Sequence, residues 1–155
     1  MCIVRLYKTI IRAVLVYGCE TWTITKKMEN MLNAFERKIL RRILGPVKEN
    51  GVWRIRYNNE IYDIYKEPNV IMFIKLRRLQ WVGHVLRMEE QSIPLKSLKG
   101  KMYGKRPVGK PRKRWLDDVR DDGRNILDSR NLERDTANRE EWRQRVREAK
   151  ARFGL

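Results

Sequence analysis

Four aspartates between residues 117 and 122 are the side chains whose spacing could support catalysis in this chain. Polymerases and nucleases use clustered carboxylates of this kind to hold two metal ions. Here the pairs Asp117-Asp118 and Asp121-Asp122 are interleaved, on an expected helix, with Arg114, Arg120 and Arg124. Ion pairs at i,i+3 and i,i+4 are the simpler interpretation, so we predict no metal site. A small magnesium-dependent nuclease is the third-ranked hypothesis.

The remaining groups that catalysis could use are isolated in the sequence. His84 is the single histidine and stands among apolar residues, which favours a packed structural role over a general base. Cys2 and Cys19 form no CxxC pair, so neither zinc nor a disulfide framework is indicated. The chain has no Gly-rich phosphate loop. We therefore predict a non-catalytic protein without a cofactor.

A basic strip at residues 100–115 is the strongest functional signal. It contains seven basic residues and no acidic one, namely Lys101, Lys105, Arg106, Lys110, Arg112, Lys113 and Arg114. Glycines and prolines keep its first part out of a helix. Such an extended cationic strip can follow a phosphate backbone, because each Lys or Arg that meets a phosphate releases a counterion. Tyr103 and Trp115, at its ends, would stack on bases or anchor the strip.

The charge is local, which sharpens the prediction of a docking surface. The 155 residues have a formal net charge of +17, whereas residues 116–155 contain ten basic and ten acidic side chains. A local excess indicates binding to nucleic acid more than it indicates general solubility. The alternative is that the run Arg112-Lys113-Arg114 is only a nuclear import signal.

Length and composition predict a folded, intracellular protein of one domain, or of one domain plus a small appendage. A hydrophobic fraction of 42% can support a core. Two cysteines without a pairing motif suit a reducing compartment, either nuclear or cytoplasmic. The most apolar run, residues 10–19, is interrupted by Arg12 and is too short to span a bilayer, so we predict no membrane partner.

Hydrophobic periodicity predicts two long helices in the first third of the chain. Residues 3–18 read as a mostly buried helix whose one polar stripe is Arg5, Lys8 and Arg12. A second helix is expected over residues 26–44, capped by Thr25 and ended by Gly45-Pro46. Its face opposite the apolar side carries Arg37, Lys38, Arg41 and Arg42.

Shorter elements are expected in the rest of the chain. Residues 51–57 alternate apolar and basic side chains and predict an extended segment, followed by a short helix to Lys66. A third long helix is expected over residues 69–88, with Lys75 and Arg78 on its outward face. Residues 90–110 read as loop, and helices are expected from Arg112 to Ile126 and from Thr136 to Arg152. The fold class is therefore mainly α, with a three-helix bundle first.

Five motifs occur in the order that one family shows. They are YGCETW (17–22), FERKILRRILGP (35–46), LRRLQWVGHVLRM (76–88), GKRPVGKPRKRWLDDV (104–119) and NREEWR (138–143). Together they resemble the C-terminal part of the reverse transcriptase polyprotein of animal non-LTR (LINE-like) retrotransposons. The resemblance implies a thumb-like three-helix bundle (1–89), a basic extended linker (90–111) and a small helical C-terminal extension (112–155). It also implies a palm domain of the polymerase as a partner in the full-length parent.

The chain departs from the family in its catalytic parts. The aromatic-Ala-Asp-Asp motif of the polymerase, the endonuclease domain and the Cys/His knuckle of some relatives are absent from this sequence. The resemblance therefore implies a fragment that does not polymerise, from a degenerate element copy in which Met1 is an internal methionine reused as a start.

Two functions remain open. The first is binding of RNA or DNA backbones by the basic strip and by the thumb residues Arg37, Lys38, Arg41, Arg42, Lys75 and Arg78. The second is a structural module that docks on a polymerase core, with the strip serving only nuclear import. That second function predicts an exposed apolar patch where the palm would pack.

Overall fold

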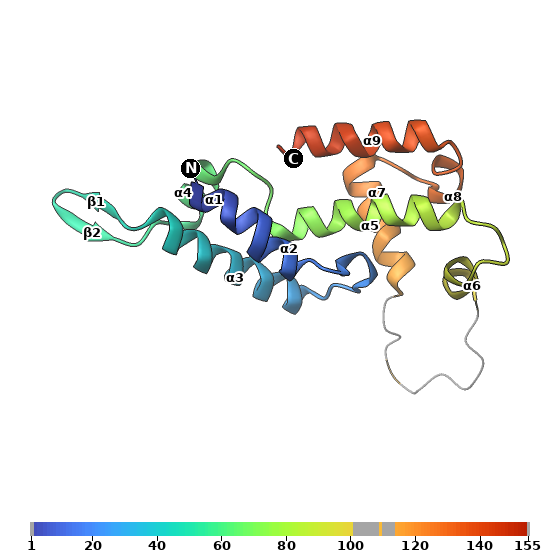
Figure 1. Cartoon of the computed structure of the whole chain (residues 1–155), viewed down its shortest axis with the longest axis horizontal. Helices are drawn as coiled ribbons and strands as arrows, with labels where there is room; N and C mark the ends of the chain where they lie inside the picture. Colours follow the sequence, from blue (N-terminus) through green and yellow to red (C-terminus); the bar gives the residue numbers. More distant parts are fainter. Residues whose placement is uncertain (1, 101–108, 110–113, 155) are drawn as a thin grey trace. The chain divides into compact units, whose positions relative to one another are not determined.

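The computed structural model describes residues 2–100, 109 and 114–154. Within them the regular secondary structure is helical apart from one two-stranded sheet, which confirms the mainly α class (Figure 1). The α-helices are α1 (Cys2–Leu6), α2 (Arg12–Leu15), α3 (Lys26–Leu44), α4 (Asn58–Tyr65), α5 (Val70–Leu86), α6 (Ile93–Lys99), α7 (Trp115–Leu127), α8 (Leu132–Asp135) and α9 (Arg139–Arg152). The strands are β1 (Val47–Glu49) and β2 (Val52–Arg54). A π-helical turn (Tyr7–Ile11) joins α1 to α2, and a 3-10 turn (Cys19–Thr21) follows α2.

The chain forms two compact units that are interleaved along the sequence. The first comprises residues 1–19, 24–74 and 150–155, and the second comprises residues 20–23 and 75–149. Helix α5 contributes its first turn to the first unit and the remainder to the second. The domain boundaries expected from the sequence are consecutive instead, and they stay a prediction.

Helix α3 begins and ends where the sequence predicts. The Thr25 hydroxyl accepts a hydrogen bond from the Met28 N–H at 3.3 Å, so it caps the first turn. The helix ends at Leu44, and the Gly45 N–H donates to the Arg41 carbonyl at 3.0 Å. Leu40 is fully buried and joins Tyr7, Ile61 and Tyr65 in the core of the first unit.

A buried carboxylate organises this core. Glu36 is fully buried and accepts hydrogen bonds from the Tyr7 hydroxyl at 2.9 Å and from the Val70 N–H at 3.0 Å. The Tyr62 hydroxyl lies 3.4 Å from its second oxygen. Three elements therefore converge on one side chain, which satisfies donors that burial would otherwise leave unpaired.

The Glu36 environment predicts a pH dependence. Burial raises the pKa of Glu36, while the Val70 N–H and the two tyrosine hydroxyls oppose the rise. A carboxyl with a higher pKa in the folded state makes stability fall as pH rises from its unfolded pKa through its folded pKa. Glu36→Gln removes this titration, so its free energy of unfolding should depend less on pH in that window than the parent's does. Urea denaturation from about pH 4 to pH 8 measures the difference, and parallel curves would contradict the prediction.

The first helix differs from the expectation of a mostly buried element. The π-helical turn holds about one residue more than an α-helical turn does. As a result, Tyr7 and Arg12 both face the core although they are five residues apart. Arg12 is 8% exposed, donates to the Tyr65 hydroxyl at 3.2 Å and lies over the Phe73 ring at 4.7 Å. The predicted polar stripe is therefore wrong at Arg12.

The opposite side of this helix is apolar and open to solvent. Leu6, Ile10, Ile11 and Val14, which we call the apolar stripe, are 49%, 55%, 38% and 75% exposed. The sequence shows apolar residues around most of the helix, and within the first unit only one side of them is covered. The expectation of a mostly buried helix is therefore wrong at these four residues.

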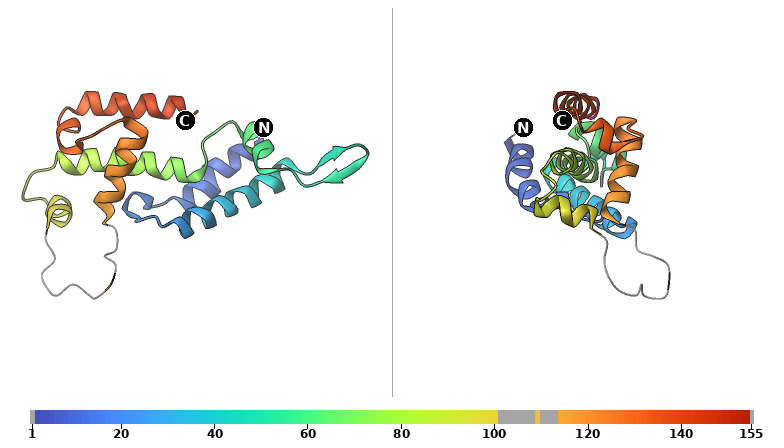
Figure 2. Two further views of the ribbon diagram at one scale, coloured as in Figure 1. Left: turned by 180° about the vertical axis from the view of Figure 1, so that it is seen from behind. Right: turned by 90° about the vertical axis from the view of Figure 1, so that its right-hand side faces the viewer.

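Residues 47–54 form a β-hairpin in the first unit, whereas the sequence predicts an extended segment over residues 51–57 without a partner strand. Val47 pairs with Arg54, Lys48 with Trp53, and Glu49 with Val52 in an antiparallel ladder. The turn residues Asn50 and Gly51 have φ values of 50° and 84°, as a type I′ turn requires. The left view of Figure 2 shows the hairpin extending beyond the end of α3.

In the second unit, α9 packs on α5 through a tryptophan and a glycine. The Trp142 ring is 2% exposed, and its Nε1–H donates to the Leu79 carbonyl at 3.1 Å. A Cβ on Gly83 would lie 2.3 Å from that Nε1, so only glycine admits the ring. Figure 1 shows the two helices side by side. Trp142 and Val146, which are four residues apart on α9, are thus both buried.

Three local expectations for the second unit are corrected. Residues 93–99 are helix α6, with Leu95 buried, whereas the sequence predicts loop over 90–110. Helix α7 begins at Trp115, three residues later than expected, where Asp117 accepts the Arg114 N–H. His84 is exposed beside the Trp81 ring, with 5.4 Å between centroids, and is not packed.

Candidate nucleic-acid interface

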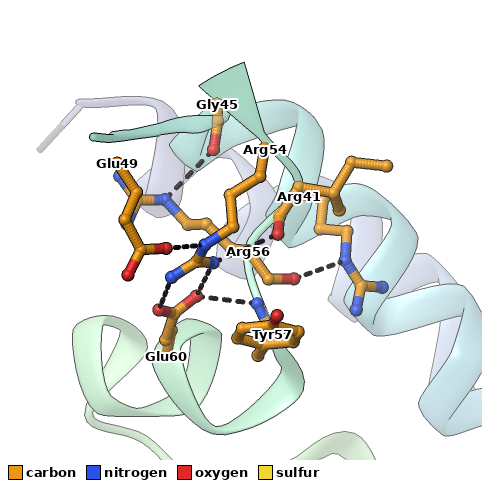
Figure 3. A network of polar contacts seen from close by, with 8 residues as sticks. Arg41, Gly45, Glu49, Arg54, Arg56, Tyr57 and Glu60 are labelled. Carbon is orange, nitrogen blue, oxygen red and sulfur yellow. Dashed lines mark hydrogen bonds and ion pairs between the residues drawn. The ribbon is translucent and has the colours of Figure 1, made fainter. Parts of the chain in front are cut away.

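Three arginines hold the hairpin against α3 and α4 (Figure 3). Arg54 donates to both Glu60 oxygens at 2.9 Å and 2.7 Å, and it also pairs with Glu49 across the turn. Arg41, in the last turn of α3, donates to the Arg56 carbonyl at 3.2 Å. Arg56 in turn donates to the Gly45 carbonyl at 3.1 Å.

This network fixes the charge of its members. The hydrogen bonds from Arg54, and then the bond from the Tyr57 N–H, lower the pKa of Glu60 to about 2. The same pairing raises the pKa of Arg54 further above its already high value. Glu60 therefore stays ionised across the physiological pH range, as its ion pair with Arg54 requires.

The hairpin and the segment after it present two aromatic side chains and one aliphatic side chain to solvent. Trp53 is 65% exposed, Ile55 is 73% exposed and Tyr57 is 63% exposed. Lys48 lies opposite Trp53 in the ladder, with its Nζ 6.0 Å from the centre of the indole. The Arg54 guanidinium lies over the Tyr57 ring at 4.5 Å. We call Lys48, Trp53, Ile55 and Tyr57 the hairpin surface.

The four predicted basic residues of α3 do not form one free face. Lys38 and Arg42 are exposed, as a phosphate contact requires. Arg37 and Arg41 are only partly exposed. Arg41 Nη2 donates to Asn58 Oδ1 at 2.6 Å, and Arg37 lies by the Tyr62 hydroxyl, whose pKa burial raises and Arg37 lowers. Two of the four residues thus serve partly to hold α4.

The expected outward face of α5 is wrong at Arg78. Its side chain is 2% exposed and pairs with Asp122, which is 8% exposed. Arg78 Nη1 also donates to the Trp22 carbonyl at 3.1 Å. Lys75 lies 3.5 Å from the other Asp122 oxygen and is 26% exposed. Burial therefore excludes Arg78 from any phosphate contact, and the ion pair with Asp122 occupies Lys75.

Most of the basic strip lies outside the described residues. These are Lys101, Lys105, Arg106, Lys110, Arg112 and Lys113. Arg114 is described and exposed. The adjacent Trp115 donates through its Nε1–H to the Glu20 carbonyl at 2.9 Å. Trp115 therefore anchors the end of the strip, which is one of the two roles the sequence allows.

The aspartates of α7 take separate partners. Arg124 lies 3.5 Å from Asp121 and Arg120 lies 3.9 Å from Asp117, both at the predicted i,i+3 spacing. Asp122 instead faces α5 and the Arg78 pair. Among the residues that the structure describes, no three His, Cys, Asp or Glu side chains gather closely enough to hold a metal ion.

The helices of the described segments differ in length and hydropathy from a membrane span. None of the helices there combines the length and the apolar character needed to cross a membrane.

The hairpin is the candidate element that sequence reasoning missed, although Asn50-Gly51 between the apolar runs was an available signal.

Comparison with known proteins gives one match. No family model matches the chain, and neither does any solved structure. A protein of Caenorhabditis elegans described as transposon-derived is 27% identical over 118 residues, which cover 76% of this chain and 42% of the relative. The chain thus spans well under half the length of the curated relative it matches. The observation supports a transposon-related origin for the chain.

Proposed function

We propose that this chain binds nucleic acid through its phosphate backbone, as the non-catalytic C-terminal part of a retrotransposon reverse transcriptase. The basic strip and the exposed cations of α3 supply the contacts. Such contacts position a nucleic acid without reading its sequence.

The single observation that carries the proposal is the uncompensated positive charge. Many acidic side chains in the described residues are held in ion pairs within the chain, among them Glu49, Glu60, Glu67, Asp122 and Glu133. The chain has 36 Lys and Arg against 19 Asp and Glu side chains, so a formal charge of +17 is left without acidic side chains to balance it. An excess of this size attracts polyanions over distances comparable to the Debye length.

The transposon-derived relative supports the part of the proposal that concerns the origin of the chain. The more specific assignment to a non-LTR reverse transcriptase rests on the ordered motifs of the sequence. A polymerase palm and the full-length polyprotein as partners are part of that proposal.

A salt series tests the binding. Anisotropy titrations against duplex DNA and structured RNA should show affinity falling steeply with salt. Alanine at six strip positions should flatten the slope of log affinity against log salt concentration by several units. The positions are Lys105, Arg106, Lys110, Arg112, Lys113 and Arg114. Each lost phosphate contact removes about 0.7–0.9 from that slope.

A charge-matched control separates local contacts from overall charge. Alanine at six exposed arginines of the C-terminal region removes the same charge elsewhere, at Arg130, Arg134, Arg139, Arg143, Arg147 and Arg152. The control should keep nearly the parent slope. Equal slopes for the parent and the strip variant would rule out the strip as the binding arm.

The apolar stripe favours a second function, docking onto a polymerase palm. Leu6, Ile10, Ile11 and Val14 are the kind of exposed apolar surface that this alternative predicts. Met31 and Phe35 of α3, 63% and 42% exposed, add to the apolar surface of the first unit. If the titrations show no salt-dependent binding, docking becomes the better explanation of the fold.

A further inference from the structure

We propose that the hairpin surface stacks on unpaired bases, so that the chain prefers single-stranded nucleic acid, or the single-stranded end of a duplex, at this site. The inference rests on the proposed nucleic-acid binding and specifies the form of nucleic acid that one part of the chain takes.

The aromatic rings are placed for stacking. Trp53 lies in β2, and Ile55 and Tyr57 lie in the short segment that joins β2 to α4. Each keeps more than three fifths of its surface open to solvent. Aromatic rings on an extended element are the platforms on which successive bases stack in single-strand binding proteins.

The charges around the rings suit a phosphate backbone. Lys48 is exposed beside the Trp53 indole, at a position from which its ammonium can meet the phosphate of a stacked nucleotide. Arg54 lies over the Tyr57 ring and is itself held by Glu49 and Glu60, so one face of that ring rests on a positioned guanidinium. Exposed Lys38 and Arg42 on α3 extend the positive potential toward the hairpin.

The anchoring network makes the surface preorganised. The hairpin ladder has only three residues per strand, and a free hairpin of that length is marginal in water. The bonds from Arg41, Arg54 and Arg56 fix its base to α3 and α4. A ring held in place loses less entropy on stacking than a mobile ring does.

A protein partner is a poorer fit for the same surface. A chain that added a strand to the hairpin edge would find three residues to pair with, flanked by cations. A base needs no such edge, because every base has a face that stacks on an indole or a phenol.

Substitution of the two rings tests the proposal with the full chain. The probes are fluorescent oligothymidine and a blunt duplex of the same length, each in anisotropy titrations. Trp53→Ala should weaken oligothymidine binding roughly tenfold, and Trp53→Ala with Tyr57→Ala about a hundredfold, while duplex binding changes less than about twofold. Trp53→Phe with Tyr57→Phe should restore most of the affinity, because both replacements stack.

Controls separate the possible failures. Tyr17→Ala removes an aromatic ring that is 88% exposed on the same unit but outside the hairpin, and it should leave both affinities unchanged. An oligothymidine that carries 2-aminopurine should lose fluorescence when the parent chain binds, and much less with the double alanine variant. Unchanged oligothymidine affinity in that variant, or an equal loss for the duplex, overturns the stacking role while leaving backbone binding intact. A parent chain that binds neither probe overturns the proposed function itself.

Discussion

Asp122→Ala should lower the free energy of unfolding of the second unit by about 3–5 kcal/mol, one of the two largest effects we expect in this chain. The substitution leaves the Arg78 guanidinium buried with its bond to the Trp22 carbonyl and no carboxylate. Its Nε already has no hydrogen-bond partner among the described residues. Urea denaturation followed by circular dichroism measures the loss.

A neighbouring aspartate and a double variant test the cause. Asp121→Ala removes a carboxylate whose partner Arg124 is 60% exposed, and it should change stability by less than about 1 kcal/mol. Arg78→Met combined with Asp122→Leu should recover most of the lost stability, because it removes both buried charges. A double variant as unstable as Asp122→Ala would show that packing, and not the unpaired charge, is responsible.

Trp142→Ala should have an effect of similar size and lower the free energy of unfolding by about 3–5 kcal/mol. The indole is almost fully buried and fills the space that Gly83 leaves on α5. Trp142→Phe keeps an aromatic ring and removes only the Nε1–H bond to Leu79, so its loss should be about 1–2 kcal/mol.

A glycine variant provides the reverse test in the same denaturation series. Gly83→Ala leaves Trp142 in place but puts a methyl group within 2.3 Å of its Nε1, and should therefore destabilise the same interface. If Trp142→Ala proves as stable as the parent, α9 does not depend on this contact with α5.

The helices of this chain are largely predictable from sequence, because their signals are local. Thr25 and Gly45 mark the ends of α3, and both lie where capping preferences place them. The faces of the first helix are not predictable in the same way. An insertion of one residue into a turn shifts every later side chain, so Arg12 turns inward although its position in an ideal helix places it on the polar stripe.

In the candidate site, too, the features set by local periodicity are predictable from sequence and those set by distant partners are not. Exposure of Lys38 and Arg42 follows from helical periodicity, which the sequence shows directly. Burial of Arg78 does not follow from it, because its partner Asp122 is 44 residues away and both charges become acceptable only together. The hairpin surface also depends on a contact between two strands. Lys48 and Trp53 become neighbours only through the Asn50-Gly51 turn.

That turn has a chemical consequence. In an Asn-Gly sequence the backbone nitrogen of the glycine meets little steric hindrance and attacks the side-chain amide of the asparagine. The reaction releases ammonia and forms a cyclic imide, which water opens to aspartate or isoaspartate. Asn50 is exposed, so this ageing would put a negative charge, or an extra methylene in the backbone, at the tip of the hairpin. Material stored for long would then carry a second population that binds polyanions less well, separable from fresh protein by its lower isoelectric point.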